Sequence, residues 1–210
     1  MKKLQPSPRR QHNREAAIQN ILDTARAIMR EEGVSALSMQ ELARRMGMRA
    51  PSLYNYFTGK TEIYDTLFRL GFTLYDEHIK ELMKASTNLR DEIRINIEGY
   101  MSFALKNPEL YQLCFERPIP GFVPSKTSLK LSFGILNRSY QRAEQFKKEL
   151  DTTLTGQQIV DTVIAMSHGL TAMHLSNEPH LPLGQGRFGS LIPTFLAILE
   201  KAMPIKGEKK

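Results

Sequence analysis

The sequence predicts an all-α protein with an N-terminal three-helix helix-turn-helix domain and a larger helical domain. Apolar residues recur at helical spacing along most of the chain, and no stretch shows the alternation typical of a strand. Two short helical patterns, separated by a glycine, lie between residues 38 and 57. The length of 210 residues suffices for one large domain or two small ones with a substantial core.

The N-terminal residues 1–13 are predicted to form a disordered basic arm, because they combine prolines with the adjacent Arg9 and Arg10. Two interpretations of these residues remain open: the arm reaches a DNA groove or backbone, or it is a flexible end without a role. Residues 14–32 then carry apolar side chains at helical spacing, which predicts an amphipathic helix. Gly33 is expected to end it, since glycine adopts the left-handed conformation without steric cost.

The helix-turn-helix prediction depends on residues 38–60. Ser38 and Glu41 have the spacing of a capping box, which marks the start of a helix. Gly47 ends that helix, and Pro51 begins the next because its fixed φ suits a first helical turn. Any helical hairpin would share this spacing, but the basic and aromatic outer face of the second helix favours DNA binding.

The same stretch resembles the DNA-binding domain of the TetR family of transcriptional repressors. The resemblance spans about residues 12 to 72, and its most specific part is the run from Leu53 to Phe57 followed by Gly59-Lys60-Thr61-Glu62. The matching pieces are AAIQNILDTARAIMREEGVSALSM, ELARRMGM, APSLYNYFTGK and TEIYDTLF. The resemblance implies an N-terminal domain that binds DNA and an all-helical remainder that dimerises and binds an effector.

The remaining helices are predicted from their apolar spacing and boundary residues. A helix over 60–84 is long enough to bridge two domains, and Thr155 with Gln158 forms a second capping box. Pro193 predicts a kink in the last helix or a later start. Further helices are expected over 89–106, 109–116, 125–150, 155–175 and 187–203. The predicted divisions are thus the helix-turn-helix domain at 14–59, the ligand and dimerisation domain at 60–203, and a tail at 204–210, in which KGEKK is expected to be solvated.

Basic charge is concentrated in the N-terminal part. Residues 1–60 contain eleven Lys/Arg and five Asp/Glu, a net charge of +6, whereas the rest contains eighteen and seventeen, a net charge of +1. This distribution is typical of a phosphate-binding module. The single Cys114 excludes an internal disulfide and fits a reducing compartment. Without an apolar run of membrane-spanning length or a signal-peptide pattern, a cytoplasmic protein with no membrane partner is expected.

Catalytic and metal-binding patterns are not found in the sequence. His168 and His174 are six residues apart, so they lie on different helix faces and do not have ligand spacing. No phosphate-binding glycine loop or nucleophile elbow is present. We therefore expect neither an enzyme nor a cofactor or metal. Ser167-His168-Gly169 and NPELYQLCFE resemble one C-terminal domain type of TetR-like regulators that carries Trp-His-Gly, with Ser167 in place of the Trp.

The DNA contacts are predicted from exposure on the second motif helix and, for Ser38, from its place at the N-terminus of the first, where the helix dipole favours an anion. The resemblance places family contacts at the same positions. The residues expected to face base edges are Arg49, Ala50, Pro51, Ser52 and Asn55. Those expected to contact phosphates are Ser38, Tyr54, Tyr56 and Lys60. Arg49 is the long cation among the first group and suits a bidentate pair with guanine.

The larger domain is predicted to serve both dimerisation and ligand binding. The apolar stripes on 155–175 and 191–203 are expected to pair with a second copy as a four-helix bundle, the alternative being that they face the monomer's own core. Ligand-lining candidates are the large aromatic and sulfur side chains with one histidine, namely Tyr100, Phe103, Tyr111, Phe115, Phe133, Tyr140, Met166 and His168. Ordinary core packing is the alternative for each of them.

The function predicted is a repressor that binds a palindromic DNA operator as a homodimer and is released by a small apolar ligand. An architectural DNA-binding protein without an effector, and a helical enzyme with a basic surface, are the alternatives.

Overall fold

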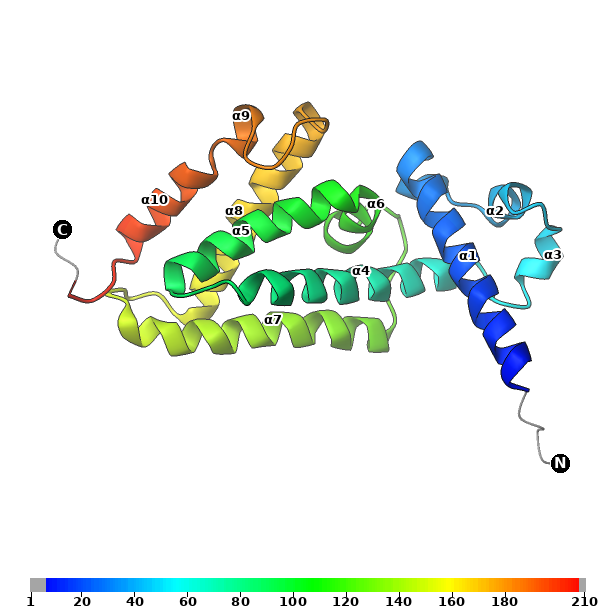
Figure 1. The fold of residues 1–210 in the computed structure, drawn as a ribbon, viewed down its shortest axis with the longest axis horizontal. Coiled ribbons are helices and arrows are strands. Elements are labelled where there is room, and N and C mark those ends of the chain that lie inside the picture. The colour runs from blue at the N-terminus through cyan, green and yellow to red at the C-terminus, as the bar shows by residue number, and fades with distance from the viewer. Residues whose placement is uncertain (1–6, 208–210) are drawn as a thin grey trace. The chain divides into compact units, whose positions relative to one another are not determined.

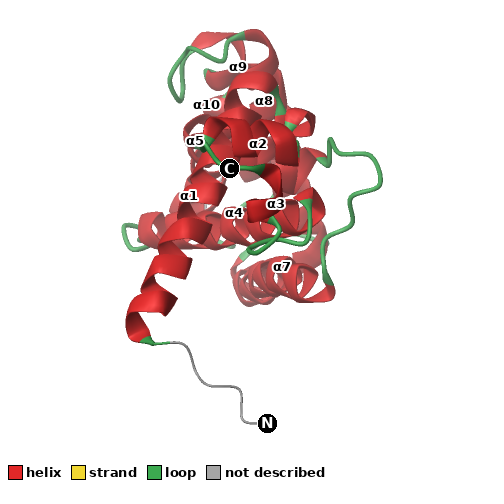
Figure 2. Cartoon of the chain, turned by 90° about the vertical axis from the view of Figure 1, so that its right-hand side faces the viewer, coloured by secondary structure: helices red, strands yellow, loops and turns green. Residues whose placement is uncertain are grey.

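The computed structural model describes residues 7–207, and these residues fold into helices joined by turns and loops (Figure 2). In chain order the elements are α1 (Pro8–Glu32), η1 (Val34–Ala36), α2 (Met39–Arg45), α3 (Ala50–Leu53), α4 (Lys60–Met83), α5 (Leu89–Lys106), α6 (Pro108–Tyr111), η2 (Gln112–Glu116), α7 (Lys126–Phe146), η3 (Lys147–Glu149), α8 (Gly156–Asn177), α9 (Gly186–Gly189) and α10 (Ile192–Ala202) (Figure 1). Over residues 7–207 there is no strand, and an isolated antiparallel bridge joins Leu150 to Ile205. The predicted all-α class is confirmed.

The chain divides into two compact units. The first contains Met1–Leu70 and Glu109–Ser128, and the second contains Gly71–Pro108 and Leu129–Lys210. This division differs from the predicted boundary at residue 59, because the first half of α4 and the segment with α6 and η2 belong to the first unit. Both segments contribute buried apolar side chains: Ile63, Tyr64, Leu67, Phe68, Leu110, Tyr111 and Leu113.

The core of the first unit explains why α1 is amphipathic. Ile21, Ala25 and Ile28 are spaced by three or four residues and are fully buried. Helix α2 packs against both α1 and α3 (Figure 2). The Tyr64 hydroxyl, which is on α4, donates a hydrogen bond of 2.8 Å to the carbonyl oxygen of Val34. This bond satisfies a polar group that the first half of α4 buries.

Helix α1 begins six residues earlier than predicted, so the assignment of residues 8–13 to a disordered arm is wrong. Ser7 is the N-cap residue and Pro8 occupies the first turn. The Ser7 carbonyl accepts the backbone N–H groups of Arg10 and Gln11, at 2.9 and 3.1 Å. A proline in the first turn fits a helix start because its missing N–H would have no partner there. The remaining arm residues, 1–6, lie outside the described residues.

Most other helix boundaries agree with the sequence prediction. Helix α5 has the predicted bounds, with the Asn88 side chain accepting the Asp91 N–H at its start. Gly33 and Gly47 end α1 and α2 with φ values of 94° and 62°. The capping box of Thr155 is present in full at the start of α8. The predicted helix 109–116 is instead a single α-turn followed by a π-helical segment.

The C-terminal part differs from the prediction in two ways. Helix α7 ends at Phe146, because the next residues form a 3₁₀ turn that leads Leu150 into its bridge with Ile205. Residues 204–206 of the predicted tail pair with residues 149–151: the Asp151 N–H donates to the Pro204 carbonyl at 2.8 Å, and the Lys206 N–H donates to the Glu149 carbonyl at 2.9 Å. Pro193 lies in the first turn of α10, so the predicted later start is confirmed and α9 is separate.

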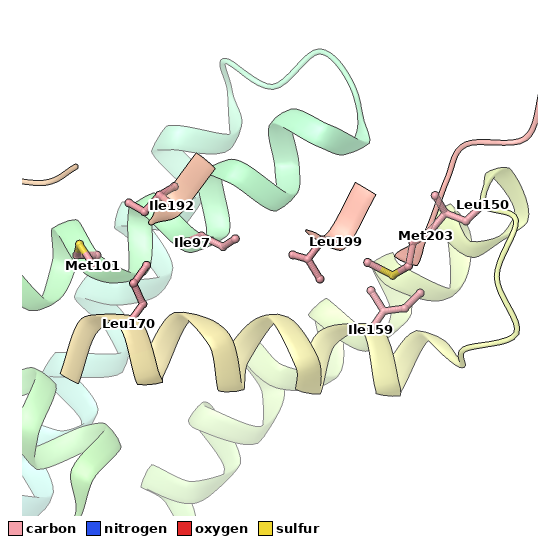
Figure 3. Close-up of a cluster of buried hydrophobic side chains, with 8 residues drawn as sticks. All are labelled: Ile97, Met101, Leu150, Ile159, Leu170, Ile192, Leu199 and Met203. Atoms are coloured by element: carbon pink, nitrogen blue, oxygen red, sulfur yellow. The ribbon is translucent and has the colours of Figure 1, made fainter. Parts of the chain in front are cut away.

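The core of the second unit lies between α5, α8 and α10 (Figure 3). In Figure 3 its side chains point toward one another from these helices and from the segment around Leu150. The cluster consists of Ile97, Met101, Leu150, Ile159, Leu170, Ile192, Leu199 and Met203. The described helices include none that is long and apolar enough to cross a membrane.

Candidate nucleic-acid interface

Ser38 positions the start of α2. Its side-chain oxygen accepts the Glu41 backbone N–H at 3.1 Å, as predicted for an N-cap. The reciprocal half of the predicted capping box does not form. The Glu41 carboxylate turns instead toward Arg44 and Arg45, with bonds of 2.7 and 2.9 Å. Charged guanidinium donors compete successfully with the backbone N–H because charge-assisted bonds are stronger.

The two arginines of α2 are paired with carboxylates. Arg45 contacts Glu31 and Glu32 at the end of α1 as well as Glu41. Hydrogen bonds from Arg44, and then from Arg45, lower the pKa of Glu41 to about 2. The Glu41 carboxylate therefore stays ionised at neutral pH, and these arginines are less available to phosphates than their count in the sequence suggests.

The turn between α2 and α3 is fixed by backbone geometry. Gly47 has a positive φ, and the Met48 N–H donates to the Ala43 carbonyl at 3.0 Å, which closes the end of α2. Arg49 precedes α3 with an extended backbone, and a proline occupies the first turn of α3. Helix α3 is only four residues long, so its own hydrogen bonds do little to hold it in place. The buried side chains of Leu53 and Phe57 anchor it to the core.

The predicted DNA contacts all lie in the first unit, and none is fully buried. Exposed positions are Arg49, Pro51, Tyr54, Asn55 and Lys60, and half-buried positions are Ser38, Ala50, Ser52 and Tyr56. Tyr54 has 55% of its surface exposed, which is high for a large aromatic residue. Within residues 7–207, neither Arg49 nor Lys60 forms an ion pair. These two cations are therefore available for phosphates or bases.

The sequence did not indicate that α1 contacts the recognition segment, which we define as residues 49–57. Arg14 Nη1 donates to the carbonyl oxygen of Asn55 at 3.1 Å. Its guanidinium carbon also lies 5.5 Å from the centre of the Tyr56 ring, within cation–π range. The two groups are 41 residues apart, so no local pattern connects them.

A second contact that the sequence did not indicate joins α1 to α6. Glu109, whose side chain is fully buried, accepts hydrogen bonds from Arg26 Nε at 2.8 Å and Arg30 Nε at 2.9 Å. The side chains of Arg26 and Arg30 are 22% and 50% exposed. The three side chains place α6 firmly on the helix that supports the helix-turn-helix.

Part of the predicted ligand-binding set comes together in the second unit. The Tyr100 hydroxyl and His168 Nδ1 are hydrogen-bonded at 2.9 Å, joining α5 to α8. Tyr75, which the prediction omitted, packs its ring edge-on against Tyr100 and Phe103, with ring centres 6.0 and 5.4 Å apart. Burial raises the pKa of the Tyr75 hydroxyl. The cluster thus combines aromatic rings with the polar pair of Tyr100 and His168.

The other predicted ligand-binding residues belong to further elements of the two units. Tyr111 and Phe115 belong to the first unit, where their rings lie 5.9 Å apart. Phe133 is 55% exposed on α7. Tyr140 donates to Asp161 Oδ1 at 2.8 Å near the surface, and Met166 is half-buried on α8.

Two hollows of the second unit have other linings. One, of about 20 Å³, lies among apolar residues that include Leu89, Ile93 and Leu199. The other, of about 510 Å³, is wide open to solvent and is lined mainly by polar residues, including Lys147 and Lys206. Across the described chain, no group of three His, Cys, Asp or Glu side chains is placed to hold a metal ion.

Comparison with known proteins gives matches to the N-terminal part and to the fold. Residues 21–67 match the model of the family described as bacterial regulatory proteins, tetR family. The chain is 26% identical over 96 residues to the HTH-type transcriptional activator FasR of Mycolicibacterium smegmatis, covering 46% of this chain and 44% of that protein. It is 32% identical over 94 residues to the uncharacterized HTH-type transcriptional regulator YobS of Bacillus subtilis, covering 44% and 48%.

These matches cover about half the length of the curated relatives. The fold as a whole is similar to that of the transcriptional regulator FadR from Bacillus subtilis, solved in complex with stearoyl-CoA. The TM-score is 0.65 at 16% identity, and the alignment covers 91% of this chain and 99% of that one. The matched residues 21–67 include α2, α3 and the start of α4, where the predicted contacts lie. The family model over residues 21–67, together with the relatives and the fold, supports assignment of the chain to the TetR family of transcriptional regulators.

Proposed function

We propose that the chain represses transcription as a homodimer that binds a palindromic DNA operator and is released by a small apolar ligand. The observation that carries the proposal is the exposed recognition segment, which presents Arg49, Tyr54 and Asn55 to solvent beside the unpaired cation of Lys60. A short helix with exposed polar side chains at its N-terminal end suits reading of base edges in a major groove. Lys60 and Tyr54 suit the flanking phosphates.

Homodimerisation is supported by exposed apolar residues on α8 and α10. Ile164 and Met173 on α8 and Ile198 on α10 have 42%, 47% and 51% of their surface exposed. Ala165 and Gly169 are also exposed and share one face of α8 with Met173, which follows them by eight and four residues, whereas Ile164 lies on the opposite face. Small residues among large apolar ones allow helices to approach closely. A second copy that covers this face would bring two recognition segments to the half-sites of a palindrome, about 34–36 Å apart.

The effector class we favour is a long-chain acyl thioester of coenzyme A. The structurally similar FadR, named above, was solved with stearoyl-CoA. In this chain the second unit supplies a cluster of rings that includes the hydrogen-bonded pair Tyr100 and His168. Such an environment suits an apolar chain whose affinity rises by about 0.8 kcal/mol for each methylene buried.

The experiment that tests DNA binding is selection of duplexes from a random-sequence library by the full-length protein. We expect enrichment of a two-fold symmetric sequence, and we expect Arg49→Ala to relax its base preference at one position of each half-site. Failure to enrich any duplex would refute the proposed function. Palmitoyl-CoA, octanoyl-CoA and free coenzyme A, added to the complex, then test the effector: release should follow acyl-chain length and be absent with free coenzyme A.

Activation is the second candidate, because FasR is named a transcriptional activator. A reporter gene behind the selected duplex distinguishes the two. Repression predicts lower expression when the protein is present and recovery when acyl-CoA accumulates. Activation predicts higher expression in the same strain.

A further inference from the structure

We propose that Arg14 is a positioning residue for DNA recognition, which holds the C-terminal end of the recognition segment through the Asn55 carbonyl and the Tyr56 ring. The inference rests on the proposed DNA binding and extends it to a residue of α1. It assigns a role to a contact between two elements that are distant in the sequence.

The recognition segment needs such a support because it has little helical structure of its own. Helix α3 contains four residues, and beyond it the chain is held by the 3.3 Å bond from the Asn55 N–H to the Ser52 carbonyl and by the Tyr56 and Phe57 N–H bonds to the Leu53 carbonyl. The carbonyls at the end of a helix lack partners within the helix. Arg14 supplies one to the carbonyl of Asn55.

Arg14 also restrains the side chain that follows. Its guanidinium lies 5.5 Å from the centre of the Tyr56 ring, so one planar group contacts the backbone and the neighbouring ring together. Because α1 extends back to Pro8, Arg14 lies well inside a helix rather than at a fraying end. Its backbone position is therefore fixed relative to the core that α1 packs against.

The alternative is that Arg14 is simply another phosphate contact. The two roles predict different measurements. A phosphate contact contributes alike to every sequence and to the salt dependence, by about one unit of slope for each charge. A positioning residue affects the geometry of the groups that read bases, so its loss reduces the ratio of specific to non-specific affinity.

The test uses the full-length protein, the duplex that it selects from a random library and a scrambled duplex of equal length. Arg14→Ala is compared with Arg9→Ala, which removes the same charge from another face of α1. We expect Arg14→Ala to lower the specificity ratio about tenfold, from the loss of one hydrogen bond and one cation–π contact. Arg9→Ala should leave the ratio unchanged.

Arg14→Lys keeps the charge but loses the planar fork, so it should recover only part of the ratio while keeping the wild-type salt slope. Since Arg14 is exposed, melting temperatures of both variants are expected to remain near that of the wild type. If Arg14→Ala does unfold, the Arg14→Lys ratio decides the question. Equal losses on both duplexes with a flattened salt slope, or a ratio equal to that of Arg9→Ala, would overturn the proposal. No duplex enrichment by the wild type would instead refute the proposed function itself.

Discussion

Replacing Glu109 by glutamine is expected to destabilise the first unit by about 2 kcal/mol, because it removes a buried negative charge that two arginines of α1 share. Glutamine has nearly the same volume, so no cavity is created. The oxygen of the glutamine side-chain amide can accept a hydrogen bond from one guanidinium, but the N–H groups of the amide face the other guanidinium, which is also a donor. The substitution thus isolates the electrostatic contribution of the contact between α1 and α6.

The magnitude follows from the exposure of the three groups. Removing one partner of a fully buried pair costs about 3–5 kcal/mol, because the other charge is left without compensation. Here the Glu109 side chain is fully buried, but Arg26 and Arg30 are 22% and 50% exposed and can turn partly toward water. We therefore place the cost below that range, and expect Arg26→Gln to cost more than Arg30→Gln.

Thermal unfolding followed by circular dichroism gives the first measurement. A loss of about 2 kcal/mol corresponds to a fall in melting temperature of about 4–8 °C for a chain of this size. The chain contains no tryptophan, so local stability is better followed by hydrogen exchange of α1 peptides detected by mass spectrometry. Exchange around Ile28 should accelerate more than exchange in α8, which belongs to the second unit.

Glu116→Gln is the matched control, since Glu116 lies in the same segment and is exposed. It should change the stability by less than about 0.5 kcal/mol. The double variant Arg26→Gln with Glu109→Gln should cost less than the two single losses together, because the groups interact. A Glu109→Gln stability within about 0.5 kcal/mol of the wild type, or strictly additive losses, would refute the reasoning.

Three further predictions concern DNA binding, assembly and pH. Lys60→Ala should weaken binding to selected and scrambled duplexes alike and flatten the salt dependence by about one unit of slope, measured by fluorescence anisotropy from low to moderate salt. Gly169→Leu should dissociate the dimer in sedimentation experiments, whereas Gly134→Leu, on α7 and outside the proposed dimer face, should not. Neither change should unfold the monomer, because beyond the neighbouring residues and the backbone of its own helix a Cβ at either position meets nothing within 4 Å. Burial, and then the charge of Lys106, lower the pKa of His78 below 6.5, so the unfolded chain takes up this proton more readily. Stability should accordingly decline as pH falls through and below 6.5, and His78→Gln should reduce the difference between melting temperatures at pH 7.5 and 5.5; an undiminished difference would assign it to other groups.

Helix positions could be predicted from the sequence where both ends carry local signals. The start of α5 has the N-cap Asn88 and its end is followed by Asn107-Pro108, and both bounds were predicted correctly. The start of α1 was missed although Ser7-Pro8 is a helix-start pattern, because the surrounding basic and proline-containing composition favoured disorder. The bridge of Leu150 with Ile205 could not be predicted, since pairing across that distance in the chain leaves no local pattern.

In the candidate site, too, features with a local sequence pattern could be predicted and features that depend on distant contacts could not. Exposure of Tyr54 follows from the helical spacing of the buried Leu53 and Phe57, which the sequence contains. The bond from Arg14 to Asn55 and the burial of Glu109 depend on contacts 41 to 83 residues apart, which only the folded chain defines. Charge counts were also misleading in one respect: Arg45 looks available for DNA in the sequence, but Glu31, Glu32 and Glu41 surround it.

The first unit is built from two separate segments of the chain, because residues Glu109–Ser128 belong to it. This affects how the DNA-binding parts of such regulators can be exchanged. A chimera that joins residues 1–70 of this chain to the remainder of another regulator would keep Arg26 and Arg30 but bring a foreign partner to them. It would also expose the surface that Leu110 and Leu113 cover. To exchange DNA specificity between relatives, residues 109–128 must therefore be transferred together with residues 1–70. A graft of the N-terminal residues alone is expected to yield a protein that binds its duplex but aggregates more readily than either parent.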